Sequence, residues 1–268
     1  MPDPPHPVTD SKSLCNGHLL KIDAHVTGSR PLVISTGDNA PTGSISLASN
    51  VLQELTSIEK TQVKYECMTQ TDGCYELCIG EGCQIPRWRI GSVILYNICT
   101  ETFATSVAAD SVSAAMTEAI SMWGEIKGVV FKEVGRDDPA TFRIKYKKSH
   151  SSHPNVYAKS FLPRECPSSL VVYQKALENT SYLANILAHE LGHIWGLRHE
   201  FAPEKEKYLP SVRIGSENRQ SIMNYFDDLS KLQVGEQDRK ELAAFYAHGQ
   251  AKYEGLLIVN ITAPLHTW

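Results

Sequence analysis

The feature that most constrains this chain is the stretch at residues 188–200, AHELGHIWGLRHE. It places His189 and His193 four residues apart, and residues at that spacing lie on one face of an α-helix, one turn above the other. A helix here therefore aims two imidazoles at one point, as two ligands of a tetrahedral zinc ion require. Glu190 lies about 100° around such a helix from His189, so it can reach a metal-bound water without being a ligand.

A third ligand has to come from beyond the helix, because a continuing helix would rotate His199 away from the other two histidines. Gly196 offers the solution, since glycine adopts positive φ without penalty and often ends a helix in a sharp turn. The chain can then return and bring His199 to the same metal. Three histidines leave the fourth zinc position open for water, which is typical of a catalytic zinc site.

Two other readings of the stretch are less specific. Two histidines on a helix can belong to an ordinary amphipathic surface, but the full HExxHxxGxxH pattern fixes five residues at set spacings. A structural zinc site would need a fourth protein ligand and would leave Glu190 without a task. The motif therefore predicts a hydrolytic site with one catalytic Zn²⁺.

The remaining composition is ordinary for a globular protein. The 268 residues are 42% hydrophobic and 21% charged, with a formal net charge of -4. This balance gives no reason to expect a nucleic-acid partner or an anionic membrane surface, and no apolar run reaches the ~20 residues of a membrane span. The first residues, MPDPPHPVTDSKSLCNGH, do not resemble a secretory signal peptide.

Residues 1–84 differ from residues 85–268, which we expect to form the catalytic domain. The N-terminal part is rich in Pro, Gly, Ser and Thr, with a short helix expected at 49–58, and we interpret it as a segment that resembles a prosegment. Four of the seven cysteines lie near its end, at Cys67, Cys74, Cys78 and Cys83. Their spacing differs from that of a zinc ribbon and favours a small patch held by disulfide bonds. Disulfide bonds would favour an extracellular location, in conflict with the missing signal peptide.

Strands and helices alternate after residue 84, and helices then dominate. β-Branched and aromatic residues predict strands, and helical spacing of apolar residues predicts helices, the first of them with Asp110 as its N-cap. We expect strands at 92–103, 129–134, 141–146, 155–161 and 169–173, and helices at 110–127, 181–195 and 235–248. This order predicts an α/β (α+β) fold with one sheet.

The motif resembles that of the metzincin clan of zinc endopeptidases, in which HExxHxxGxxH is followed by a methionine-containing turn. Residues 221–225 read SIMNY, so the resemblance implies that Met223 lies in a turn beneath the three histidines. Tyr225 matches the tyrosine that astacin-like and serralysin-like enzymes place beside the zinc, and Glu200 also looks astacin-like. The run FAPEKEKYLP after Glu200 departs from the astacin pattern.

The resemblance implies a zincin-like fold, with a twisted mixed sheet, a backing helix, an active-site helix and a smaller C-terminal subdomain. It implies hydrolysis of peptide bonds in extended polypeptide substrates. His189, His193 and His199 would hold the zinc, Glu190 would be the general base, and Tyr225 would stabilise the transition state. Residues 155–161 are the candidate edge strand for the substrate. The alternative is a catalytically silent or latent protein of the same fold that binds peptides.

The N-terminal part offers two candidate groups for blocking the zinc. Asp38, in STGD, is loosely similar to the aspartate of astacin prosegments, and a free cysteine from the 67–83 cluster could act as in matrixin prosegments. We favour a turn aspartate and a disulfide patch over either blocking role.

Overall fold

The computed structural model describes most of the chain after residue 84 and a few residues before it. The described residues are 65, 67–69, 84–126, 128–150, 153–165, 168–205 and 211–268. Contacts between Cα atoms divide the chain into residues 1–58 and residues 59–268, so all described residues belong to the second unit. Among them, no helix has both the length and the hydropathy to cross a membrane. The helix expected at 49–58 lies outside the described residues.

A five-stranded sheet forms the centre of this unit, in the order β3-β2-β4-β6-β5. The four strands β3, β2, β4 and β6 are parallel, and β5 pairs with β6 in the antiparallel direction at the edge. Their bounds are β2 Val93–Ile98, β3 Val130–Glu133, β4 Phe142–Lys147, β5 Ala158–Lys159 and β6 Ser168–Tyr173. The strand expected at 92–103 is shorter than predicted, because a 3-10 turn at Thr100–Thr102 follows β2. Of the short edge strand predicted at 155–161, only Ala158–Lys159 forms a strand, β5, at the edge of the sheet.

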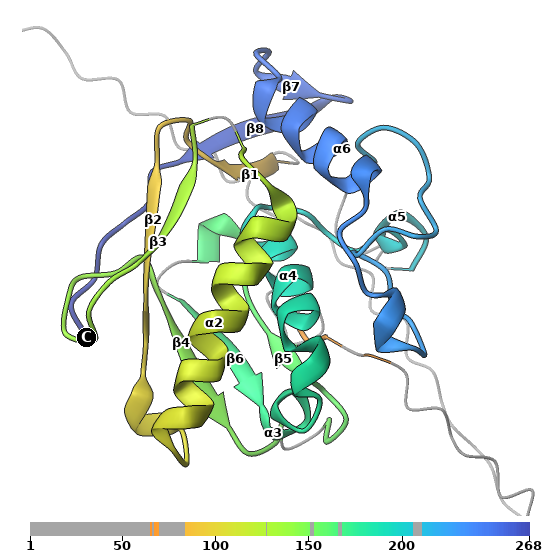
Figure 1. The fold of residues 1–268 in the computed structure, drawn as a ribbon. Coiled ribbons are helices and arrows are strands. Elements are labelled where there is room, and N and C mark those ends of the chain that lie inside the picture. Colours follow the sequence, from red (N-terminus) through yellow and green to blue (C-terminus); the bar gives the residue numbers. More distant parts are fainter. Residues whose placement is uncertain are drawn as a thin grey trace, which may run out of the picture. The chain divides into compact units, whose positions relative to one another are not determined.

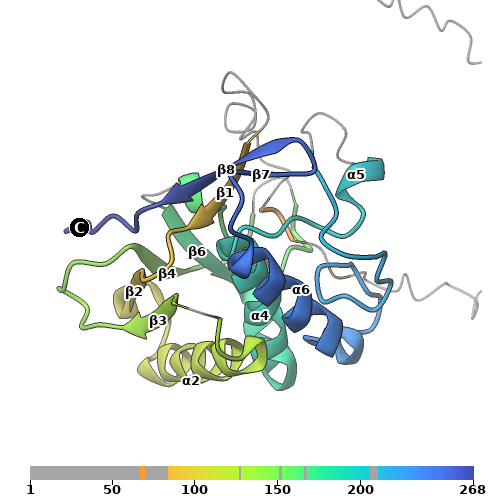
Figure 2. The same ribbon diagram turned by 90° about the horizontal axis from the view of Figure 1, so that it is seen from above.

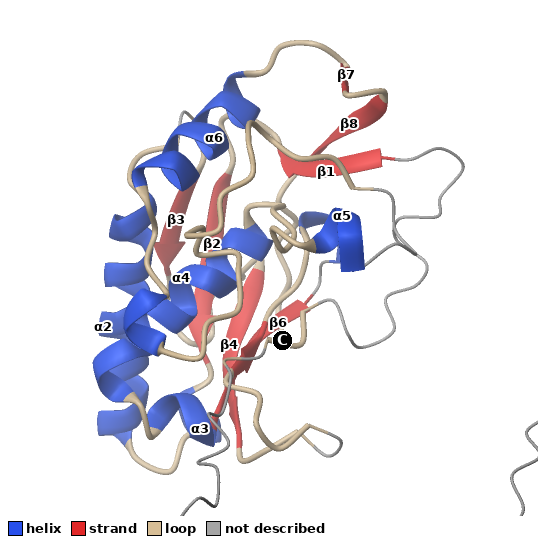
Figure 3. Ribbon diagram, turned by 90° about the vertical axis from the view of Figure 1, so that its right-hand side faces the viewer, coloured by secondary structure: helices blue, strands red, loops and turns tan. Residues whose placement is uncertain are grey.

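Two helices lie side by side on one face of this sheet, α2 (Ser106–Trp123) and α4 (Leu183–Ile194) (Figures 1 and 3). The predicted N-cap of the first, Asp110, is wrong. The helix begins one turn earlier because the Thr105 side chain accepts a hydrogen bond from Ala108 N, as an N-cap residue does. The buried Trp123 at the other end of α2 donates from Nε1 to Ala188 O at 2.8 Å, which ties α2 to the middle of α4.

A second sheet, with the order β1-β8-β7, contradicts the expectation of one sheet. β1 (Gln84–Trp88) pairs in parallel with β8 (Leu256–Ile261), and β7 (Lys252–Tyr253) pairs with β8 in the antiparallel direction. Figure 2 shows β8 beside β1, although the two strands lie at opposite ends of the described chain. This sheet was missed because β1 and β8 are far apart in sequence, and because β7 and β8 follow a region in which helices were expected to dominate.

The remaining helices are short, apart from α6 (Glu236–Ala247), which confirms the helix expected at 235–248. They are α3 Gln174–Leu177, α5 Ala202–Lys205 and the 3-10 turns Pro163–Glu165, Thr180–Tyr182 and Leu229–Lys231. The predicted fold class is confirmed: a mixed α/β unit with a backing helix, a buried helix that carries the motif, and a C-terminal part with a turn at Met223 and a last helix.

Candidate metal centre

Helix α4 carries the first part of the motif into the core. Its start differs from the expected residue 181, because residues Thr180–Tyr182 form a 3-10 turn before it. His189, Glu190 and His193 are each 0% exposed, so all three polar side chains are removed from bulk water. Burial of this kind requires partners, and the partners define the site.

The turn after α4 is the one predicted from Gly196. Its φ is +98°, and the hydrogen bonds Gly196 N to His193 O and Leu197 N to Gly192 O, at 2.8 and 2.9 Å, form a Schellman motif. The ring centroids of His193 and His199 then lie 4.7 Å apart. The three predicted ligand histidines are therefore brought together by a helix and a glycine turn.

Main-chain carbonyls orient the two helical imidazoles. His189 Nδ1 lies 2.7 Å from Ile222 O, and His193 Nδ1 lies 2.9 Å from Leu197 O. A carbonyl oxygen only accepts, so Nδ1 carries the proton and the Nε2 lone pair faces inward, as in metal-ligating histidines. His189 Nε2 is buried and has no hydrogen-bond partner among the described residues.

The electrostatic environment keeps these imidazoles neutral. Burial, and then the neighbouring His199, lower the pKa of His189 to about 3. The same two causes, in the same order, lower the pKa of His193 well below its usual value. Neutral imidazoles with inward lone pairs are the form in which histidine binds zinc, so this donor set fits the ion that the motif predicts.

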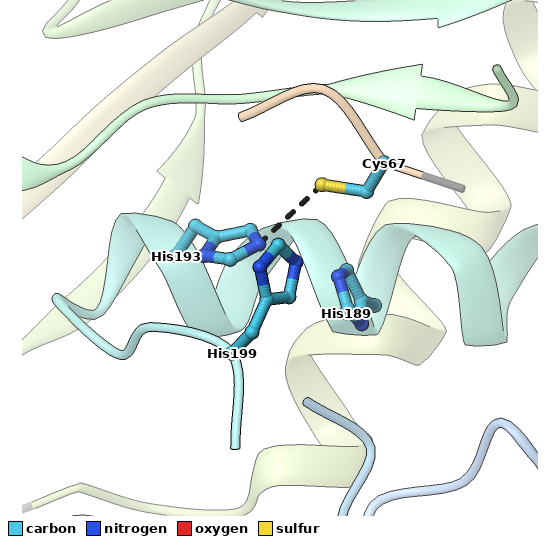
Figure 4. A group of neighbouring side chains, drawn as sticks. All are labelled: Cys67, His189, His193 and His199. Carbon is cyan, nitrogen blue, oxygen red and sulfur yellow. Dashed lines mark hydrogen bonds between the residues drawn. The ribbon is translucent and has the colours of Figure 1, made fainter. Parts of the chain in front are cut away.

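The thiol of Cys67 lies beside the three histidines as a fourth donor. The sequence had instead favoured a disulfide patch for the cysteines near it. Cys67 Sγ lies 3.4 Å from His193 Nε2, and the ligand atoms of Cys67, His189, His193 and His199 all lie within 4.8 Å of one another (Figure 4). Cys67 is a free, buried thiol, so the expected disulfide patch does not include it. Cys74, Cys78 and Cys83, and also Asp38, lie outside the described residues.

The carboxylate of Glu190 is held by hydroxyl groups of the chain. Tyr65 OH donates to Oε1 at 3.2 Å, and Thr69 Oγ1 donates to Oε2 at 2.8 Å. The Ser160 hydroxyl donates to the main-chain oxygen of Glu190 at 3.0 Å. Burial raises the pKa of Glu190, against the lowering effect of hydrogen bonds from Ser160 and Thr69. Tyr65, Thr69 and Ser160 were not predicted, because an isolated hydroxyl residue carries no signal in a sequence.

The turn at Ser221–Tyr225 closes the site from below. Met223 is buried, and its side chain packs so closely against Gly192 of α4 that a Cβ there would clash with it. The main-chain oxygen of Met223 accepts a hydrogen bond from Glu200 N at 3.1 Å. Asp238, at the start of α6, holds this turn: its Oδ2 accepts from Ile222 N at 3.2 Å and from Gly235 N at 2.8 Å. Sequence reasoning missed Asp238, whose position resembles an ordinary helix-start residue.

Tyr225 and Glu200 border the histidines. The Tyr225 ring lies 4.7 Å from the His199 ring, and its hydroxyl donates to Cys67 O at 2.9 Å. Glu200 Oε1 accepts from Asn218 N at 2.8 Å and lies 3.4 Å from Arg213 Nε. Tyr225 is thus next to the point at which the three histidines meet, whereas Glu200 faces the loop that leads into the turn at Met223.

The family model for matrixin matches residues 87–247, whereas no curated protein matches the chain in sequence. Among solved structures, myroilysin is 15% identical with a TM-score of 0.42, over 72% of this chain and 97% of that one. The hatching enzyme zinc-protease HCE-1 from Oryzias latipes (medaka) is 13% identical with a TM-score of 0.40, over 60% and 94%.

The matched region spans more than half of the sequence and includes α2, the whole motif, the turn at Met223 and α6. The predicted resemblance to the metzincin clan is thereby confirmed. The matching family within the clan is matrixin, whereas the sequence analysis had compared Tyr225 and Glu200 with astacin-like enzymes. The chain belongs to the matrixin family of metalloproteases.

Proposed function

We propose that this protein is a zinc-dependent endopeptidase in a latent state, in which the chain's own Cys67 blocks the metal site. One observation carries the proposal: three histidines and the Cys67 thiol converge on one point, with all ligand atoms within 4.8 Å of one another. His189, His193 and His199 would hold the ion. Cys67 would occupy the fourth position, which a substrate or water needs in a catalytic zinc site.

A zinc ion at this position would supply a Lewis acid that polarises the scissile carbonyl and makes the attacking water more acidic. Glu190 would accept the proton of that water and pass it to the leaving amine. Burial raises the pKa of Glu190, and a higher pKa brings a carboxylate base closer to the operating pH. The Tyr225 hydroxyl, once released from Cys67 O, would donate a hydrogen bond to the developing oxyanion.

The substrate would be an extended polypeptide that pairs with the outer edge of β5. This proposal is supported by the chain's own segment 67–69, which already uses that edge: Cys67 forms an isolated bridge with Ala158, and Met68 N lies 3.5 Å from Ala158 O. Strand addition supplies main-chain hydrogen bonds that do not depend on sequence. The edge can therefore hold a peptide backbone directly above α4.

The test compares the full-length chain with Cys67→Ala, each loaded with zinc, on a fluorogenic peptide and on denatured casein. We expect Cys67→Ala to hydrolyse both and the unmodified chain to be much slower, because the variant frees one zinc position. A strong chelator should abolish the activity, and zinc should restore it. Absence of chelator-sensitive hydrolysis in zinc-loaded, folded Cys67→Ala would contradict the proposed function and favour a silent peptide-binding protein.

A further inference from the structure

Both carboxylate oxygens of Glu190 are occupied by hydroxyl groups from the same short segment. Tyr65 OH donates to Oε1 at 3.2 Å and Thr69 Oγ1 donates to Oε2 at 2.8 Å. Both residues are buried, Tyr65 at 1% and Thr69 at 5% exposed. These two hydroxyls take up part of the acceptor capacity of the carboxylate, so they compete with an attacking water for Glu190 and hinder proton transfer to it.

The Thr69 hydroxyl lies in a cradle formed by Glu190 and Ser160, and the Cys67 thiol donates to it at 3.3 Å. Besides donating to Glu190, Oγ1 accepts from Ser160 N at 2.8 Å and lies 3.1 Å from Ser160 Oγ. Ser160 in turn donates from Oγ to Glu190 O at 3.0 Å. α4 and the residue after β5 therefore form a site for one hydroxyl, with an anionic acceptor on one side and a main-chain donor on the other.

The Tyr65 side is fixed by packing as well as by its hydroxyl. Its ring lies 5.4 Å from the Tyr157 ring and 5.1 Å from the His189 ring, and Tyr65 N donates to Phe226 O at 3.0 Å. The two ends of the segment are thus attached on opposite sides of Cys67. The hydrogen bonds from Tyr65 and Thr69 to Glu190 involve neither the thiol nor a metal ion.

We propose that Glu190 and Ser160 form a metal-independent binding site for hydroxyl-bearing peptide side chains, which the chain's own Tyr65 and Thr69 occupy. The segment 65–69 then closes the site in two separate ways, by the thiol at the metal position and by two hydroxyls on the general base. The binding site itself does not depend on the proposed function, but its inhibitory effect does. Removal of the thiol alone frees the metal position but leaves the two hydroxyls on Glu190.

The experiment measures the attachment in the metal-free protein, where a zinc-thiol bond is absent. The full-length chain is treated with a strong chelator, and the alkylation rate of Cys67 by iodoacetamide is followed by mass spectrometry of its peptide. Cys99, a second buried free thiol, reports on general unfolding in the same sample. The variants are Tyr65→Phe, Thr69→Val and the double variant.

Thr141→Val is the matched control. Thr141 is fully buried, and its Oγ1 has no hydrogen-bond partner among the described residues, so this variant has the same change in shape without the loss of an attachment. Tyr65→Phe is the more direct of the two test variants, because Thr69 Oγ1 also accepts a hydrogen bond from Cys67 Sγ at 3.3 Å and its loss changes the thiol itself.

In the metal-free parent chain, we expect Cys67 to react as slowly as Cys99. Each single variant should raise the alkylation rate of Cys67 at least about tenfold, which corresponds to about 1.4 kcal/mol. The alkylation rate of Cys99 should stay at the parent value in these variants, and both rates should stay there in Thr141→Val. Fast Cys67 alkylation in the metal-free parent, or parent-like rates in both variants, would overturn the proposal. Equal acceleration of Cys67 and Cys99 would overturn it too, since general unfolding would then explain the rates.

A second arm measures the inhibitory effect in zinc-loaded protein on the Cys67→Ala background. Adding Tyr65→Phe and Thr69→Val should raise kcat/KM at least about tenfold above Cys67→Ala alone. No increase would contradict the second closure. If no variant hydrolyses peptide at all, the proposed function fails, and the alkylation result still decides whether the binding site exists.

Discussion

The glycine turn that brings His199 to the metal position can be tested by Gly196→Ala. Two costs follow from the structure. Residue 196 has φ +98°, where a non-glycine residue costs about 1–3 kcal/mol. A Cβ there would also lie 2.7 Å from Pro86 O, a main-chain atom of β1, and such overpacking costs typically about 1–3 kcal/mol. We therefore expect a loss of about 2–6 kcal/mol in the free energy of unfolding.

Gly255→Ala separates the two costs. Gly255 also has a positive φ, +84°, but a Cβ there meets nothing within 4 Å, so only the backbone strain applies. Urea denaturation of the chelator-treated proteins measures each loss without a contribution from metal binding. Competition with a chromophoric chelator then measures zinc affinity, which we expect to fall in Gly196→Ala because His199 is displaced, and to remain unchanged in Gly255→Ala. Equal stability losses in the two variants, or unchanged zinc affinity in Gly196→Ala, would refute this account of the turn.

Three further substitutions test the proposed roles of single groups. Glu190→Gln on the Cys67→Ala background should retain about one zinc per chain and lose peptidase activity by orders of magnitude, because an amide cannot act as the base; loss of zinc in an elemental analysis would instead indicate a ligand or structural role. Tyr225→Phe on the same background should lower kcat and kcat/KM alike by about 10²-fold, whereas unchanged turnover with a lower thermal midpoint would make Tyr225 a packing residue. Asp238→Ala should lower the free energy of unfolding by about 2–4 kcal/mol in urea denaturation, because it leaves the buried Ile222 N–H and the Gly235 N–H without their acceptor. A loss below about 1 kcal/mol would show that the turn at Met223 does not depend on this carboxylate.

The parts of the site that the sequence predicts are those built from local spacing. His189 and His193 share one helix, and a single positive-φ glycine connects that helix to His199, so the relative placement of the three is fixed within eleven consecutive residues. The turn at Met223 was reached through family resemblance rather than geometry. Its support by Asp238 depends on a hydrogen bond between side chain and main chain across 16 residues, and no periodic pattern indicates such a contact.

The parts that the sequence does not predict depend on contacts between distant segments. Cys67 and His193 are 126 residues apart, and Tyr65 and Glu190 are 125 residues apart. The four clustered cysteines indicated disulfide bonds. Sequence alone cannot distinguish a cysteine in a disulfide bond from a free thiol that faces three histidines. The pairing of β1 with β8 was missed for the same reason, since strand partners are selected by tertiary packing rather than by local propensity.

The most direct test of the central claim is zinc K-edge X-ray absorption of the zinc-loaded, full-length protein. The account predicts three nitrogen neighbours at about 2.0–2.1 Å and one sulfur neighbour at about 2.3 Å, with the sulfur replaced by oxygen or nitrogen in Cys67→Ala. A full-length protein that binds one zinc ion with no sulfur neighbour, or a sulfur neighbour that persists in Cys67→Ala, would contradict a site formed by His189, His193, His199 and Cys67.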